Sequence, residues 1–110
     1  MSEKIRLVQN DTRPSIVVTL TDEQSNSAIN LTGATVRLYF RQTGFSELQA
    51  TVVASVVDPE NGVCVFYPST APEMLAGQPG DYEGEIEITF DDGTIQTVYG
   101  ILKFRVREDF

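Results

Sequence analysis

The most constraining feature of this sequence is a two-residue alternation of apolar and polar side chains that recurs in short segments. In residues 35–41, Val36, Leu38 and Phe40 alternate with polar residues, and in residues 81–90 three glutamates occupy the odd positions. Successive side chains of a β-strand point to opposite faces, so these segments predict strands with one face in a core and one in solvent. The alternation therefore predicts an all-β fold.

Turn residues divide the sequence into about seven such strands. Asn61-Gly62 and Asp92-Gly93 predict hairpin turns, because glycine adopts positive φ without steric cost. Gly100 predicts a bulge in the last strand. The predicted strands cover residues 5–8, 15–20, 35–41, 51–57, 62–67, 81–90 and 94–107.

The period changes once, near residues 70–76. Thr70 and Glu73 have the spacing of a capping box, which predicts one short helical turn at a corner between sheets. Tyr82 follows this turn, where immunoglobulin-like sandwiches place a corner tyrosine. We therefore predict an immunoglobulin-like, two-sheet antiparallel β-sandwich of about seven to eight strands, forming one domain over residues 1–110.

The residue inventory argues against catalysis and cofactor binding. The chain has no histidine, and therefore lacks the commonest general base and transition-metal ligand. Its single cysteine, Cys64, lies in the apolar run 63–66 and is predicted to be a core residue. No phosphate-binding or dinucleotide-binding glycine motif occurs. We predict a protein that is not an enzyme and uses no cofactor.

Two acidic turns, at residues 58–61 and 91–93, could offer oxygen ligands to calcium. Neither has the spacing of an EF-hand loop, and aspartate, asparagine and glycine are the residues that tight hairpins require. The sequence therefore predicts turns here and no metal site.

The charge balance restricts the partners. Sixteen acidic residues against eight basic ones give a formal charge of -8, which repels phosphate backbones and anionic lipids. No apolar run approaches the ~20 residues of a membrane span. The first six residues lack the apolar segment of a secretory signal. We expect no nucleic-acid or membrane partner, and synthesis in a cytoplasm.

Three outward-facing glutamates form an acidic stripe on the strand at residues 81–90. This stripe could be a docking face for a basic partner. We favour the alternative, a solvated face whose charge is partly offset by cations of the final strand, at ~0.2–1 kcal/mol per pair. The glutamates are Glu83, Glu85 and Glu87, and the cations are Lys103, Arg105 and Arg107.

Other candidate contact elements are the sheet edges, the polar loop at residues 22–30 and the C-terminal Phe110. Phe110 is an apolar residue beyond a charged run. It could insert into a neighbour's pocket or be a frayed end.

Two stretches of the sequence resemble a known family. Residues 10–22 read NDTRPSIVVTLTD, and residues 30–37 read NLTGATVR. The turn at residues 58–62, the Gly-Asp-Tyr-Glu at residues 80–83 and the Asp-Gly-Thr at residues 92–94 follow in the same order. Together these motifs resemble the N-terminal domain of tailed-phage baseplate upper proteins, over roughly residues 5–107.

This resemblance implies an immunoglobulin-like module of a phage virion. In the family the domain usually precedes a further module, whereas this sequence stops at Phe110, which favours an adaptor or decoration role. We expect a structural protein of the baseplate, tail, neck or capsid surface. It would be made in the bacterial host cytoplasm, bind other virion proteins and be present in multiple copies. The alternative is a small carbohydrate-binding or calcium-dependent adhesion module.

Overall fold

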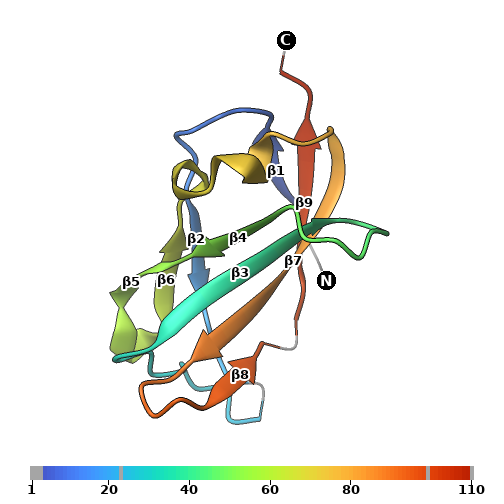
Figure 1. Ribbon diagram of the computed structural model, residues 1–110. Helices are drawn as coiled ribbons and strands as arrows, with labels where there is room; N and C mark the ends of the chain where they lie inside the picture. Colours follow the sequence, from blue (N-terminus) through green and yellow to red (C-terminus); the bar gives the residue numbers. More distant parts are fainter. Residues whose placement is uncertain (1–3, 23, 99, 110) are drawn as a thin grey trace.

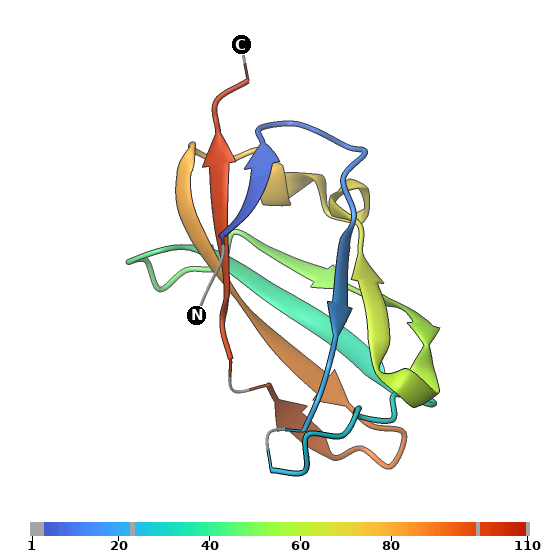
Figure 2. The ribbon, with the colours of Figure 1, turned by 180° about the vertical axis from the view of Figure 1, so that it is seen from behind.

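Two β-sheets pack face to face in the computed structural model, which describes residues 4–22, 24–98 and 100–109 (Figures 1 and 2). The larger sheet has the strand order β1-β9-β7-β3-β4, with β8 also paired to β7, and the smaller has the order β2-β6-β5. The predicted all-β sandwich is confirmed. The strands are β1 (Lys4–Val8), β2 (Ile16–Thr19), β3 (Thr35–Gln42), β4 (Ala50–Val53), β5 (Ser55–Asp58), β6 (Val63–Phe66), β7 (Gly80–Thr89), β8 (Ile95–Thr97) and β9 (Leu102–Arg107).

With β4 counted as an additional edge strand, β2, β6 and β5 take the places of the second, fifth and fourth strands of a seven-stranded immunoglobulin-like sandwich, and β3, β7 and β9 take those of the third, sixth and seventh. All pairs between named strands are antiparallel except β1 with β9, which is parallel. The predicted antiparallel arrangement is confirmed for every other pair of named strands. Both strands run toward the same end of the molecule, and the chain then crosses from β1 in the larger sheet to β2 in the smaller one (Figure 1).

The strand predicted at residues 51–57 is two strands in different sheets. β4 pairs with β3, and β5 pairs with β6. Ala54 joins them, and its backbone N–H donates to the carbonyl of Val36 (2.9 Å). The alternation shows which side chains are buried but not which sheet each half joins, so the boundary was missed.

The strand predicted at residues 94–107 is also interrupted, near Gly100 as expected. Glu87 pairs with Thr97 and Gly84 with Leu102, so three steps along β7 match five steps on the partner strand. The extra residues confirm the predicted irregularity. Ile95 is exposed, and Tyr99 lies outside the described residues.

Short 3₁₀ turns form the predicted helical corner. They are η2 (Pro68–Thr70) and η3 (Pro72–Leu75), and a third, η1 (Pro59–Asn61), connects β5 to β6. The capping box is not formed, because Thr70 donates its hydroxyl to the carbonyl of Tyr67 (2.7 Å) and Ala71 occupies the N-cap of η3. Each turn begins at a proline, whose fixed φ suits a first helical position.

The core lies between the sheets and contains the inward residues of the alternating segments. Phe40 stacks on Tyr82 with ring centroids 4.8 Å apart and meets Phe104 edge-on at 5.1 Å. Cys64 is fully buried in the smaller sheet, as predicted. All seven residues expected in the shared core are at most 2% exposed: Val36, Leu38, Phe40, Ile86, Ile88, Phe104 and Val106.

Tyr82 forms the predicted tyrosine corner. Its hydroxyl donates to the backbone carbonyl of Gln78, four residues upstream (2.6 Å), and its ring is buried near the start of β7. This bond fixes the chain between η3 and β7, in the way that the tyrosine corner does in immunoglobulin-like sandwiches.

The core assignment predicts that Ile88→Ala lowers the free energy of unfolding by ~2–5 kcal/mol, because the substitution leaves a cavity beside fully buried neighbours. Urea denaturation measures this change. Ile95→Ala is the matched control, because Ile95 is exposed on β8, and it should change stability by less than ~0.5 kcal/mol. A loss below that level for Ile88→Ala would contradict the core assignment.

The corner predicts that Tyr82→Phe destabilises the domain by ~0.5–1.5 kcal/mol, because the ring packing remains while one hydrogen bond is lost. Thermal or urea unfolding is the measurement, and Tyr67→Phe, at an exposed tyrosine, is the control. Equal stability of Tyr82→Phe and wild type would show that the hydroxyl contributes nothing.

Candidate docking surfaces

The three candidate glutamates lie on the outer face of the larger sheet. β7 is flanked by β3 on one side and by β8 and β9 on the other. Its odd-numbered residues point outward, because the even-numbered ones are buried. Glu85 is exposed, while Glu83 and Glu87 are half-buried by their neighbours.

Side chains of β3 partner two of these glutamates. Arg41 forms an ion pair with Glu83, with its Nη2 2.6 Å from Oε2. The hydroxyl of Tyr39 donates to Oε1 of Glu87 (2.9 Å). This hydrogen bond, with burial and the carboxylate charge, raises the pKa of Tyr39. The side chain of Glu85 forms no hydrogen bond or ion pair with any described residue.

We expected cations of the final strand to offset the charge of the three glutamates, but the register of β9 on β7 does not place these cations beside them as expected. Lys103 is opposite Glu83 without an ion pair to it, and Arg105 is opposite Asp81. Arg107 lies beyond the paired part of β7, next to Val8 of β1. The irregularity between β8 and β9 sets this register, so the cations of β9 lie toward the beginning of β7.

A small hollow opens on this outer face over β3 and β7, next to Leu48 before β4 and Ile101 before β9. Its volume is about 110 Å³, well below the ~300–1,000 Å³ of small-molecule sites. Leu48 and Ile101 contribute apolar surface and are about half exposed. The hollow fits one side chain of a protein partner better than a free ligand. Its lining residues are Tyr39, Arg41, Leu48, Glu83, Gly84, Glu85 and Ile101.

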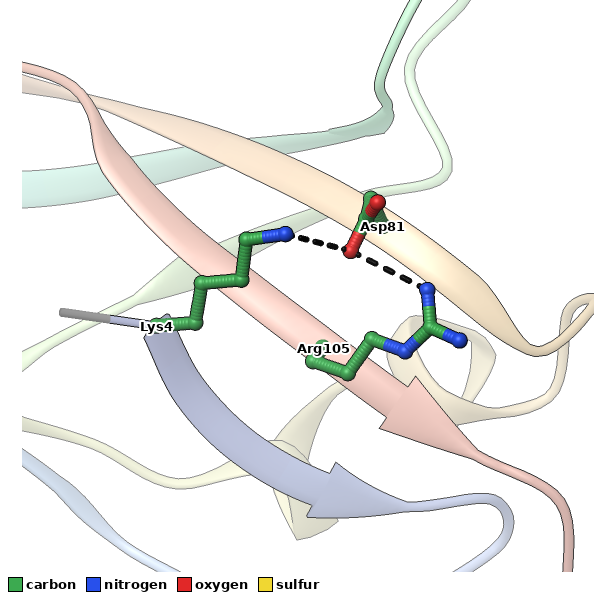
Figure 3. Close-up of polar contacts among 3 residues, drawn as sticks. All are labelled: Lys4, Asp81 and Arg105. Carbon is green, nitrogen blue, oxygen red and sulfur yellow. Dashed lines mark hydrogen bonds and ion pairs between the residues drawn. The ribbon is translucent and has the colours of Figure 1, made fainter. Parts of the chain in front are cut away.

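Cations gather on the outer face of the β1–β9 pair. Lys4 lies opposite Lys103, and Arg6 opposite Arg105. Asp81 on β7 bridges two of them, because its Oδ1 lies 2.9 Å from Nζ of Lys4 and 3.2 Å from Nη1 of Arg105 (Figure 3). We call this surface the basic strip, and it consists of Lys4, Arg6, Lys103, Arg105 and Arg107.

Sequence reasoning missed the basic strip, because its two halves are about a hundred residues apart in the chain. The available indication was the same every-second-residue spacing of cations in residues 4–6 and 103–107. Only the pairing of β1 with β9 brings these rows together.

The loop at residues 22–30 is more ordered than its composition predicts. Thr21 and Ala28 form an isolated β-bridge, and Asn26 adopts a positive φ of 57° to close the turn. Glu23 within it lies outside the described residues, as does the candidate Phe110. The exposed edges carry apolar side chains at Val53 and Val57.

The acidic turns use their carboxylates locally. Asp92 accepts hydrogen bonds from the backbone N–H and hydroxyl of Thr94 (3.0 and 2.6 Å), which lowers the pKa of Asp92. Asp58 accepts from the side-chain amide of Asn61 (2.9 Å). Within residues 4–22, 24–98 and 100–109, no three His, Cys, Asp or Glu side chains cluster as metal ligands.

Burial raises the pKa of the Cys64 thiol to about 11, so the thiol is not expected to be a nucleophile.

In the described part of the chain, no helix has the length and apolarity needed to span a membrane.

In comparisons with known proteins, no family model matches this sequence, and no curated protein is significantly similar to it.

The bridge at Asp81 predicts a pH effect. Hydrogen bonds from Lys4 and Arg105 hold the pKa of Asp81 below its usual 3.8. A depressed carboxylate pKa stabilises the fold above the unfolded-state pKa, and this contribution disappears as the pH falls through the folded-state pKa. Lys4→Met should therefore raise the pKa of Asp81, measured by NMR titration of its carboxyl carbon. Lys103→Met, without a bond to Asp81, is the control, and a larger shift in the control would exclude the bridge.

Proposed function

We propose that the chain is a non-enzymatic structural component of a tailed bacteriophage or prophage virion. It acts as an adaptor or decoration module of the baseplate, tail, neck or capsid surface through protein–protein contacts. The observation that carries the contact role is the side-chain-sized hollow on the outer face of the larger sheet, with exposed apolar residues and paired charges around it.

The virion assignment is supported by the sequence resemblance, whose residues have clear structural roles. Leu31 is buried. Asn30 accepts hydrogen bonds from the backbone N–H and hydroxyl of Thr32 (3.0 and 2.6 Å). Gly33 has a φ of 73°, and a side chain there would crowd Asp91. These features build the reversal into β3, so the shared motif is consistent with a shared fold.

The surroundings of the hollow suit a protein partner. Protein interfaces combine an apolar anchor site with a polar rim, and their anchors are single side chains in small pockets. Leu48 and Ile101 provide the apolar part, while Arg41 and Glu83 hold each other in place at the rim. Glu85, which has no described partner, is available to a donor from the partner.

The test is mass spectrometry on purified particles of the phage or prophage whose genome encodes this chain. We expect the chain in multiple copies per particle, and its absence from intact particles would overturn the virion assignment.

A matched pair of variants tests the contact face. Leu48→Glu should reduce incorporation of the chain into particles, because a charge in the hollow cannot be desolvated cheaply. Ile95→Glu places the same charge on exposed β8 outside the hollow and should incorporate normally. Equal incorporation of both variants would show that the hollow is not the contact.

A further inference from the structure

The basic strip concentrates charge in a way that stability does not explain. It contains five of the eight basic residues of a chain whose net charge is -8. Lys4 lies opposite Lys103, and Arg6 opposite Arg105, across the parallel β1–β9 pair. Like charges that face each other directly across two strands destabilise the pair. The arrangement therefore weakens the isolated domain at the place where its two terminal strands join.

The strip is only partly neutralised from within. One carboxylate oxygen, Oδ1 of Asp81, serves both Lys4 and Arg105 (Figure 3). The ion pairs of the described residues give no acidic partner to Arg6 or Lys103. An external anion would therefore meet two unpaired cations whose backbone positions are fixed by the pairing of β1 with β9.

A groove runs along the strip at the edge of the larger sheet. Four cations and two aliphatic residues line it: Lys4, Arg6, Leu7, Val8, Arg105 and Arg107. β1 is the outermost strand of this sheet, and no other described strand pairs with its free side. A free strand edge can accept an extended peptide through backbone hydrogen bonds.

The spacing of the cations fits a strand. They recur at every second residue on both β1 and β9, which is a repeat of about 6.6–6.8 Å. Side chains on one face of an extended peptide have the same repeat. A folded anionic surface would match this row only by coincidence, whereas a strand laid along it matches at successive positions.

We propose that this groove binds an extended acidic segment of a partner protein, with Asp or Glu at alternate positions and apolar residues between them. The segment pairs with the free edge of β1. Its carboxylates contact Arg6 and the neighbouring cations on the outer face, and its apolar side chains lie along the inner side next to Leu7. Carboxylate–guanidinium contacts are the strong, directional kind.

The free edge of β1 favours a peptide over a nucleic acid, because a peptide backbone can continue the strand pairing through its N–H and C=O groups and a nucleic acid cannot. This proposal rests on the contact role proposed above, because it takes the partner to be a protein. It adds that the bound part of the partner is an acidic, extended segment.

The test uses the purified chain and two labelled synthetic peptides, each about ten residues long. One alternates glutamate and valine, and the other has the same composition with all glutamates in one block. The alternating peptide should bind and shift the amide NMR signals of β1 and β9. The block peptide should bind at least ~10-fold more weakly, because its charges do not follow the repeat.

Charge-reversal variants distinguish binding in the groove from non-specific attraction of the peptide to positive charge. Arg6→Glu should weaken binding of the alternating peptide by ~10-fold or more, and Arg6→Gln by less. Arg13→Glu makes the same charge change at an exposed cation outside the groove and should leave the affinity within about twofold of wild type. The chemical-shift dispersion of the amide NMR signals shows whether each variant is folded.

Three results would overturn the proposal. The first is that the alternating peptide does not bind at low salt, and the second is that the block peptide binds equally well. The third is that wild-type chains associate with each other in sedimentation experiments while Arg6→Glu chains do not. The last result would make a second copy the occupant. Because the peptide-binding experiment uses no virion, a negative result does not contradict the virion assignment. In the same way, absence of the chain from purified virions would not contradict peptide binding in the groove.

Discussion

The contact of Phe40 with Tyr82 and Phe104 holds the three central strands of the larger sheet together on their inner side. Gly84 makes this packing possible, because a Cβ there would lie 2.6 Å from Leu38 and 3.1 Å from Phe104. The surfaces outside depend on this arrangement. The same register that packs the rings places Arg41 beside Glu83 on the opposite face, so the core determines which outer charges meet.

The sequence predicted what depends on short-range periodicity. The alternation correctly identified the inward row of β3 and the buried row of β7, and Tyr82 was correctly assigned to a corner. Features that depend on strand partners could not be predicted. Nothing local distinguishes Ala54 as the point where a strand changes sheet. Nor does any short segment reveal that Lys4 will lie opposite Lys103, since that contact joins the two ends of the chain.

Net charge describes this molecule poorly. A value of -8 suggests a uniformly acidic surface, and on that basis we expected no nucleic-acid or membrane partner. The fold separates the charges instead. Loops at residues 58–61 and 91–93 contribute carboxylates, while most cations share one sheet edge. At physiological salt, charges beyond about 8 Å are largely screened, so a partner responds to the local surface and not to the total.

The parallel pairing of β1 with β9 also determines how the domain responds to mechanical force. β1 begins near the N-terminus and β9 ends near the C-terminus, and both strands point the same way (Figure 2). Pulling the two ends apart therefore slides one strand along the other, so the backbone hydrogen bonds between them are strained together and not opened one at a time. Forced unfolding is governed by the unfolding rate, and this geometry raises its barrier. A module built in this way can transmit tension between two attachments without first unravelling from either terminus.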